Sequence, residues 1–284
     1  MTIPPSSSIR PPLKKFLADR TWPLAVIAHR GAWHGAPENS LASVELAIRN
    51  GYDFVEIDVQ TTADGGLICL HDDTLERMTG RSGQVARSRT ADLADLRLKD
   101  GAGGDGAAFS SHAPAFLEDL LSVSAGNIYV DIDVKHLRDM DAVGHILRDH
   151  PYRSHLNLKM LVQDEQDLRR IDALEASAGV LVKPILRLSP RTLPACLELL
   201  RQRPTPLVET LFDDWDCFVP FAKAARLCGT DMFLNTLDAV PSADVTDTLS
   251  VKDPDRGWGR LVAHGVRLVQ TDRPQALKAY ASTL

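Results

Sequence analysis

Short apolar runs end in polar residues three times within residues 24–72. The runs, each with the polar residue that follows it, are Ala25–Ala28 before His29, Phe54–Ile57 before Asp58, and Leu67–Leu70 before His71. Short apolar runs bounded by glycine and polar residues are typical of buried strands. Open sheets and closed barrels place their functional groups at the ends of such strands. The pattern therefore predicts that this stretch contributes a site.

The segment between the first two runs has the pattern of a helix. Apolar residues recur at helical spacing over residues 41–48, with Asn39 or Ser40 as the predicted N-cap and Asn50-Gly51 as the end. A strand, a helix and a strand with short connections form a βαβ unit. Such a unit implies parallel strands joined by a right-handed crossover.

A turn signal at residues 64–66 predicts that Leu67–Leu70 folds back on the second strand as the arm of a hairpin. This hairpin would return His71 to the neighbourhood of His29. Residues 73–112 then break the alternation with several glycines. We expect an inserted loop or small subdomain there, not a layer of the main fold.

From Phe116 onward, strand-like and helix-like segments alternate again. Strands are predicted at residues 127–134, 158–162, 180–186, 206–211, 232–236 and 266–270, and helices at 117–123, 137–149, 164–176, 190–202, 214–228, 254–264 and 274–282. With the two earlier strands, and without the hairpin arm, these segments make eight strand–helix units. They predict an α/β fold, a (β/α)8 TIM barrel with a small insertion after the hairpin that follows strand 2; a doubly wound open sheet is the alternative. We expect residues 1–23 to form an N-terminal tail and residues 24–284 a single domain.

Composition and charge exclude several classes of protein. The chain has 284 residues, of which 44% are hydrophobic and 25% charged, as in ordinary globular proteins. Its net charge of −6 argues against a nucleic-acid partner, because nucleic-acid-binding proteins usually carry a basic stripe. The one local basic cluster, from Arg77 to Arg89, is interrupted by glycine and serine and is predicted to be a solvated loop.

The cysteines and the hydropathy pattern predict a location. The four cysteines show no metal-ligand spacing, which favours free thiols in a reducing compartment. The first residues lack the apolar segment of a secretory signal, and no apolar stretch is long enough to span a membrane. We therefore expect a cytoplasmic protein without a membrane partner.

Two pairs of carboxylates indicate a cation site. Glu56 and Asp58 lie two residues apart on a strand, so their side chains project from the same face. Two adjacent carboxylates repel one another unless a cation or a proton lies between them. Asp131 and Asp133 repeat this spacing on a later strand. The competing interpretation is that one member of the first pair is a surface residue at the end of its strand.

The order and spacing of five short motifs resemble the glycerophosphodiester phosphodiesterase family. The motifs are His29-Arg30-Gly31, Pro37-Glu38-Asn39-Ser40, Glu56-Ile57-Asp58-Val59, Thr62-Ala63-Asp64-Gly65 and His71-Asp72, and weaker matches extend over roughly residues 24–275. The resemblance implies a TIM-barrel phosphoric diester hydrolase. It also implies that the insertion helps to form the substrate pocket.

The resemblance implies specific roles for the polar residues of these motifs. His29 and His71 look like the family's acid/base pair, since imidazole titrates in the range that both steps require. Glu56, Asp58 and Asp133 would hold one divalent metal ion, with Asp133 standing where the family has the longer glutamate. Three carboxylates and water suit Mg²⁺ or Ca²⁺ and not zinc. Arg30 and Lys135 would neutralise the phosphate oxygens, although Arg30 also suits a structural salt bridge.

Later strands carry weaker candidates for substrate binding. They are Lys183, Glu209, Asn235 and Phe233. For Lys183, Glu209 and Asn235, a structural role is as well supported by the sequence as a role in substrate binding. Glu209 resembles an acidic position of bacterial family members, and Phe233 stands about where many relatives carry tryptophan.

The predicted substrate is a small-molecule glycerophosphodiester, cleaved to glycerol 3-phosphate and an alcohol. A sugar phosphodiester of the agrocinopine type is the alternative substrate, because one fold supports many substrates by loop variation. The alternative from another class is a non-catalytic phosphodiester-binding protein. The presence of both histidines and all three acids argues against it.

Overall fold

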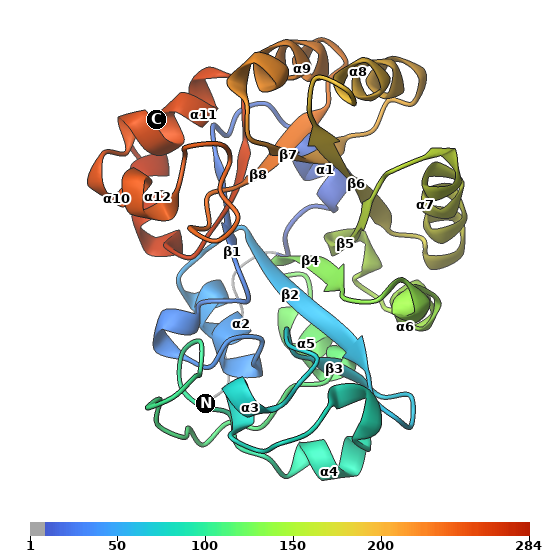
Figure 1. Ribbon diagram of the computed structural model, residues 1–284, viewed down its shortest axis with the longest axis vertical. Coiled ribbons are helices and arrows are strands. Elements are labelled where there is room, and N and C mark those ends of the chain that lie inside the picture. Colours follow the sequence, from blue (N-terminus) through green and yellow to red (C-terminus); the bar gives the residue numbers. More distant parts are fainter. Residues whose placement is uncertain (1–8) are drawn as a thin grey trace. The chain divides into compact units, whose positions relative to one another are not determined.

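The computed structural model describes residues 9–284 of the chain (Figure 1). Within these residues nine strands form one sheet in the order β1-β9-β8-β7-β6-β5-β4-β2-β3. Strand β3 is antiparallel to β2, and the other eight strands close into a parallel barrel with helices between them. The predicted (β/α)8 barrel is thereby confirmed. The chain also divides into two compact units, which are described one at a time below.

Unit 1 comprises residues 1–10, 29–158 and 174–180, of which residues 1–8 lie outside the described part of the chain. Its elements are η1 (Trp33–Gly35), α2 (Leu41–Arg49), β2 (Phe54–Thr61), β3 (Leu67–Cys69), α3 (Glu76–Thr79), η2 (Val85–Arg87), α4 (Thr90–Ala94), α5 (Leu117–Ser124), β4 (Tyr129–Val134), η3 (Leu137–Asp139), α6 (Met140–Asp149) and η4 (Arg153–His155), with the first half of β5 (Leu156–Leu161) and the end of α7 (Glu165–Ala178).

Strand β2 is the centre of unit 1. It pairs in parallel with β4, which places Glu56 beside Asp131 and Asp58 beside Asp133, and antiparallel with β3, as the predicted hairpin requires. Its first seven residues are buried. Burial on both faces explains why its apolar residues run almost without interruption, since strands of parallel barrels are covered on both sides.

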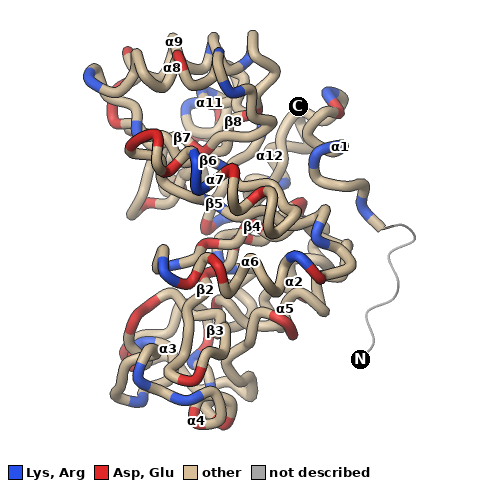
Figure 2. Tube along the Cα trace, turned by 90° about the vertical axis from the view of Figure 1, so that its right-hand side faces the viewer, with Lys and Arg blue, Asp and Glu red and all other residues tan. Residues whose placement is uncertain are grey.

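The insertion after β3 has a hydrophobic core of its own. The core consists of Ile68, Leu70, Leu75, Met78, Val85, Leu93 and Leu98. Short helices α3, η2 and α4 surround this core and are linked by glycines and polar residues. In Figure 2, basic and acidic residues lie interspersed along this part of the chain. The predicted insertion is therefore a small subdomain with a folded core.

Unit 2 comprises residues 11–28, 159–173 and 181–284. Besides the remaining parts of β5 and α7, its elements are α1 (Leu13–Ala18), β1 (Ala25–Ala28), β6 (Leu181–Leu188), α8 (Leu193–Gln202), β7 (Leu207–Phe212), α9 (Trp215–Leu227), β8 (Asp231–Asn235), α10 (Asp247–Lys252), η5 (Asp255–Gly259), α11 (Arg260–Ala263), β9 (Leu268–Thr271) and α12 (Pro274–Ala281). Strands β6 to β9 pair in parallel in chain order, and β9 pairs with β1.

Two parts of unit 2 differ from the predicted elements. Helix α10 lies in a segment for which no helix was predicted; Thr246 caps it by accepting a hydrogen bond from the backbone of Leu249. The segment predicted as one helix at 254–264 begins with the π-helical turn η5 before it continues as α11. Its glycines at 257 and 259 weaken the regular helical ladder.

The predicted N-terminal tail contains helix α1. Leu13 and Leu17 are four residues apart and therefore lie on the same face of this helix, and both are buried. The Trp22 ring stacks on the Phe16 ring with 4.3 Å between their centroids. Residues 1–8 of the predicted tail lie outside the described residues. Among residues 9–284, no helix has both the length and the apolar character needed to cross a bilayer.

Candidate active site

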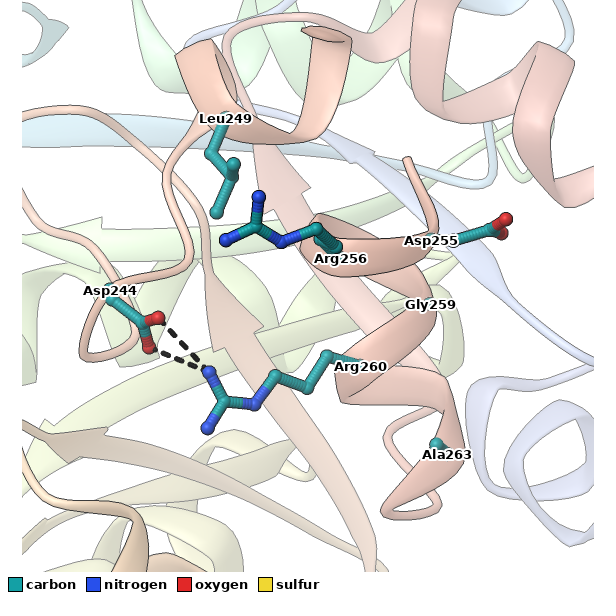
Figure 3. A pocket seen from close by; sticks show the side chains of 7 residues that line it. All are labelled: Asp244, Leu249, Asp255, Arg256, Gly259, Arg260 and Ala263. Atoms are coloured by element: carbon teal, nitrogen blue, oxygen red, sulfur yellow. Dashed lines mark hydrogen bonds and ion pairs between the residues drawn. The ribbon is translucent and has the colours of Figure 1, made fainter. Parts of the chain in front are cut away.

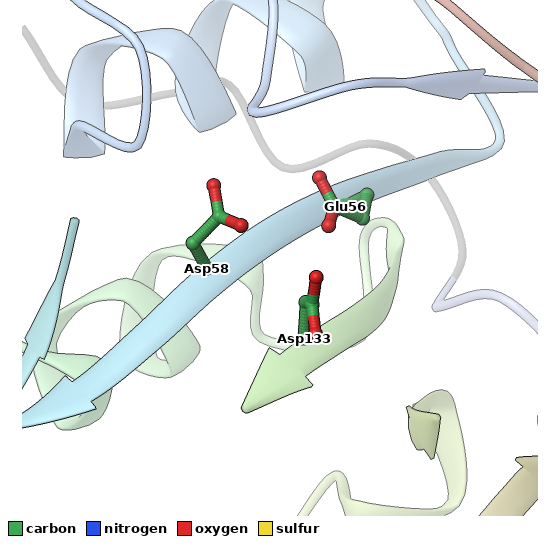
Figure 4. Close-up of side chains that lie close together, drawn as sticks. All are labelled: Glu56, Asp58 and Asp133. Carbon is green, nitrogen blue, oxygen red and sulfur yellow. The ribbon is translucent and has the colours of Figure 1, made fainter. Parts of the chain in front are cut away.

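Three carboxylates converge in unit 1. Glu56 and Asp58 project from the same side of β2, and Asp133 points toward them from β4 (Figure 4). One oxygen of each lies within 4.8 Å of the others. Glu56 and Asp58 are both 1% exposed. Asp131, the other acid on β4, accepts a hydrogen bond from Asn157 and is not part of this group.

Two cations contact the carboxylate group. Lys135 Nζ lies 3.2 Å from Asp58 Oδ1 and 3.4 Å from Asp133 Oδ2. Arg30 Nε lies 3.3 Å from Asp58 Oδ2. Burial by itself would raise the pKa of Asp58, but the positive charges of Lys135 and Arg30 outweigh it and hold that pKa well below its usual range. The Asp58 carboxylate is therefore ionised at neutral pH.

Asn39 holds Asp58 from a second side. Its Nδ2 donates a hydrogen bond to Asp58 Oδ2 at 2.8 Å, and its Oδ1 accepts one from the Asp58 backbone N–H at 3.0 Å. Of the two predicted N-caps of α2, Ser40 is the cap, since its side chain accepts from the Ser43 backbone N–H. Asn39 lies in one of the motifs named above, yet no local pattern in the sequence predicts this contact with Asp58.

The two predicted catalytic histidines differ in their surroundings. His29 Nε2 lies 4.0 Å from Glu56 Oε2, and its side chain is 13% exposed. His71 Nδ1 lies 2.7 Å from Asp72 Oδ1, and its side chain is 36% exposed. An ionised carboxylate only accepts hydrogen bonds, so Nδ1 of His71 carries the hydrogen and Nε2 remains available for proton transfer.

Glu38 and Arg77 are two further charged residues of this region, and neither was predicted as a site residue. Glu38 is 2% exposed and contacts Arg30 Nη1 with both carboxylate oxygens at 3.2 Å. Arg77 is only 27% exposed and contacts both Glu38 and Asp72. The prediction that Arg77 belongs to a solvated loop is therefore wrong, because the fold of the insertion brings the buried Glu38 and the partly exposed Asp72 to its guanidinium.

The donor set of the carboxylate group fits a divalent ion. Hard oxygen ligands suit Mg²⁺ and Ca²⁺, and both ions accept water molecules in the remaining positions. Two buried carboxylates and a third within 4.8 Å are costly to hold together without compensating positive charge. Glu56, Asp58 and Asp133 are therefore the residues of this unit suited to hold such an ion.

The candidates for substrate binding on later strands form a separate cluster in unit 2. Lys183 is fully buried, and its Nζ lies 2.8 Å from Glu209 Oε2 and 3.1 Å from the centroid of the Phe233 ring. Asn235 Nδ2 donates to Glu209 Oε1 at 3.0 Å. Burial opposes ionisation of Glu209, yet the neighbouring Lys183 and Lys159 lower its pKa. The structure thus brings the four predicted residues together. The Lys183 ammonium group is stabilised by the Glu209 carboxylate and by the face of the Phe233 ring.

A surface pocket of unit 2, of about 360 Å³, contains none of the predicted site residues (Figure 3). It is lined by Asp244, Leu249, Asp255, Arg256, Gly259, Arg260 and Ala263. Arg260 contacts both carboxylate oxygens of Asp244 at 3.0 Å and lies over the Trp215 ring. Two arginines and two aspartates balance in charge, so the pocket presents no net charge to a ligand.

Comparison with known proteins identifies the family of the segment that carries the carboxylates and histidines. Residues 29–150 match the model of the Glycerophosphoryl diester phosphodiesterase family. The match covers 122 of the 284 residues, less than half of the chain, and shows what this segment is similar to. Residues 184–281 match the model of a domain of unknown function.

Curated relatives of this family match only part of the chain. Human glycerophosphodiester phosphodiesterase 1 is 44% identical over 62 residues, which are 22% of this chain and 19% of that protein. A Mycobacterium tuberculosis relative is 45% identical over 71 residues, 25% of this chain and 26% of that protein. The chain thus matches about a quarter or less of the length of these relatives.

Solved structures of the family resemble nearly the whole chain. A glycerophosphoryl diester phosphodiesterase from Parabacteroides distasonis has a TM-score of 0.76 at 18% identity, with 96% of this chain and 91% of that chain covered. A phosphodiesterase from Oleispira antarctica, solved with the product sn-glycerol-3-phosphate, has a TM-score of 0.65 at 24% identity, with 92% and 97% covered. At these identities the likeness shows the barrel fold.

Proposed function

We propose that this protein is a metal-dependent phosphodiesterase that hydrolyses glycerophosphodiesters to glycerol 3-phosphate and an alcohol. The observation that carries the proposal is the convergence of Glu56, Asp58 and Asp133 within 4.8 Å, in the segment that matches the family model. The product bound to the Oleispira antarctica phosphodiesterase supports the choice of a glycerol ester.

Glu56, Asp58 and Asp133 would hold one Mg²⁺ or Ca²⁺ ion. When bound, such an ion polarises a phosphate oxygen and lowers the pKa of a bound hydroxyl or water. The protein's own task at this position is to keep three carboxylates ionised and oriented. Asn39 orients Asp58, and Lys135 contacts both Asp58 and Asp133.

His29 and His71 would move the two protons of the reaction. Hydrolysis forms one phosphorus–oxygen bond and breaks another, so the attacking oxygen loses a proton and the leaving alkoxide gains one. One imidazole accepts the first proton and the other donates the second. The hydrogen bond from His71 Nδ1 to Asp72 supports this role, because it leaves Nε2 free to exchange a proton. If the substrate carries a hydroxyl next to the ester, that hydroxyl would attack first and release the alcohol, and water would then open the cyclic phosphate to the phosphomonoester.

Arg30 and Lys135 would neutralise charge that develops on the phosphate oxygens. Both cations already lie at the carboxylate group, at 3.3 Å and 3.2 Å from Asp58. Positive groups fixed before the reaction stabilise a developing charge without reorganisation. The substrate-binding roles of Lys183, Glu209, Asn235 and Phe233, and the cytoplasmic location, stay predictions.

A substrate panel tests this function. The purified protein is incubated with glycerophosphocholine, glycerophosphoethanolamine and sugar phosphodiesters, with and without Mg²⁺ or Ca²⁺, and the released phosphomonoester is measured. We expect metal-dependent turnover of the glycerol esters. Turnover of sugar esters alone would move the substrate to the agrocinopine type. No turnover of any ester, with metal bound, would favour a phosphodiester-binding protein.

A further inference from the structure

Arg77 of helix α3 has all sides of its guanidinium occupied. Its Nε lies 2.7 Å from Asp72 Oδ2 and its Nη2 lies 2.9 Å from Asp72 Oδ1, which makes a bidentate pair. The same Nη2 lies 2.6 Å from Glu38 Oε1, and Nη1 donates to the Ala102 carbonyl at 2.6 Å. Bidentate arginine–carboxylate pairs combine charge with a defined geometry. Arg77 therefore fixes two carboxylates at once.

Each of these two carboxylates also contacts a predicted site residue. Asp72 Oδ1 lies 2.7 Å from His71 Nδ1. Both oxygens of Glu38 lie 3.2 Å from Arg30 Nη1. A continuous network of hydrogen bonds and ion pairs therefore links His71 to Arg30 through Asp72, Arg77 and Glu38.

The loop at residues 101–104 holds Arg77 in this position. Gly101 O accepts the Glu38 backbone N–H at 2.9 Å, and the Gly104 N–H donates to Arg77 O at 2.8 Å. A Cβ atom at Gly103 would lie 2.5 Å from Arg77 O, and this glycine has a φ of +67°. Glycine at 103 thus allows the loop to pack directly against the backbone of Arg77.

We infer that Arg77 is a positioning residue, which sets the orientation of His71 through Asp72 and that of Arg30 through Glu38. This inference rests on the proposed function. The insertion thereby contributes to the catalytic geometry from outside the barrel strands. The hydrogen bond from Arg77 is also the main reason that the pKa of Asp72 falls to about 2, so that Asp72 is ionised well into the acidic range. An ionised Asp72 accepts from Nδ1 of His71 and selects the tautomer with a free Nε2.

Lysine should not replace Arg77. A guanidinium presents donors in a planar fork, whereas an ammonium group is a point charge on a flexible stem. Lysine at this position would contact one carboxylate and leave the other without its partner. Misplacement of a catalytic group by about 1 Å costs on the order of 100-fold in rate. We therefore expect a lower kcat for both Arg77→Ala and Arg77→Lys.

The experiment compares wild type, Arg77→Ala, Arg77→Lys and Arg77→Gln with the control Arg81→Ala, all as full-length proteins. Arg81 lies in the same insertion, is exposed, and its side chain donates a hydrogen bond to the backbone carbonyl of Asp92. The measurements are kcat and KM with Mg²⁺, Mg²⁺ affinity by calorimetry, and the tautomer of His71 from ¹⁵N NMR of its ring nitrogens. Methylguanidine is added to Arg77→Ala to test for rescue.

We expect Arg77→Ala to lower kcat by about 10- to 100-fold with little change in Mg²⁺ affinity, and methylguanidine to restore part of kcat. The His71 ring should hold hydrogen at Nδ1 in wild type and become a mixture of tautomers in the variant. Unchanged kcat and tautomer in a folded Arg77 variant would overturn the inference while the proposed function stands. An inactive wild type would refute the proposed function, and the tautomer would then decide the inference. If Arg77→Ala does not fold, Arg77→Gln and Arg77→Lys provide the same comparison.

Discussion

Asn39 and Asp58 form a two-point contact, in which the Asn39 amide donates to the carboxylate at 2.8 Å and accepts from the Asp58 backbone N–H at 3.0 Å. Asn39 has a φ of +54°, in the left-handed region that asparagine tolerates better than most residues. The contact joins the loop after β1 to β2, and it fixes the direction of the Asp58 carboxylate. Asn39 is therefore positioned to orient the Asp58 carboxylate toward the proposed metal site.

Replacement of Asn39 should weaken metal binding. Glycine accepts the left-handed backbone of this position, so Asn39→Gly removes the amide without backbone strain. We expect the Kd for Mg²⁺ or Ca²⁺ to rise by about 10- to 100-fold, the usual effect of removing a group that orients a ligand. Isothermal titration calorimetry measures this change. Asn50→Ala, at the exposed end of α2, is the control, and an equal Kd in Asn39→Gly would contradict the prediction.

Both histidines should be required for turnover. We expect His29→Ala and His71→Ala each to lower kcat by about 10²- to 10⁴-fold, the range for general acid/base catalysis. Steady-state kinetics on glycerophosphocholine with Mg²⁺ measures the change. His145→Ala, at an exposed position of α6, should leave kcat unchanged. A normal rate in either site variant would remove that histidine from the proposed mechanism.

Activity should depend on a divalent ion held by the three carboxylates. We expect EDTA to abolish turnover, and Mg²⁺ or Ca²⁺ to restore it, because the carboxylates supply hard oxygen ligands. Glu56→Gln removes one charge at nearly constant size and should weaken metal binding. Glu45→Gln, on helix α2, provides the matched control. Full activity in excess chelator would refute the metal assignment.

The ion pair of Asp72 should make stability depend on pH at the acidic end. In the folded protein the hydrogen bond from Arg77 lowers the pKa of Asp72 from 3.8 to about 2. Because the folded pKa is the lower one, the pair stabilises the folded state above pH ~4, and this contribution disappears as the pH falls toward 2. Asp72 is partly exposed, so solvent reduces the size of the effect.

Asp72→Asn tests this dependence. We expect this variant to have a lower free energy of unfolding than wild type near neutral pH, with a difference that shrinks as the pH falls below about 4. Urea unfolding at several pH values measures it. Asp73→Asn is the neighbouring control, since the Asp73 side chain is 70% exposed. If the difference in the free energy of unfolding between wild type and Asp72→Asn does not change with pH, the charge of the Asp72 carboxylate does not cause that difference.

The Lys183–Glu209 pair should contribute to stability as a buried unit. We expect Lys183→Met to lower the free energy of unfolding by about 3–5 kcal/mol, because it leaves the Glu209 carboxylate buried without its nearest cation. The double variant Lys183→Met/Glu209→Gln should recover part of this loss. Arg201→Met, which breaks the exposed pair with Glu198, should cost less than about 1 kcal/mol. Equal losses in the buried and the exposed variant, by urea unfolding, would contradict the prediction.

Most strands and several helices were predicted from the sequence because they depend on local pattern, whereas the roles of the site residues came from the family resemblance and stay predictions. Continuous apolar runs mark strands that are buried on both faces, and the spacing of Glu56 and Asp58 places both side chains on one face of β2. The eight alternating units were enough to predict the closed barrel. The folded insertion was expected as a feature, although its core could not be assigned.

Contacts between residues far apart in the chain required the tertiary structure. The resemblance predicted Asp133 beside Glu56 and Asp58, but the positions of the side chains show that Asp133 approaches this group while Asp131 pairs with Asn157. Arg77 was predicted to be solvated because glycine and serine interrupt the basic cluster in which it lies. Its partner Glu38 lies 39 positions away and reaches it only through the fold of the insertion. Local pattern determines secondary structure, whereas charge pairing depends on which side chains the packed chain brings within a few ångströms.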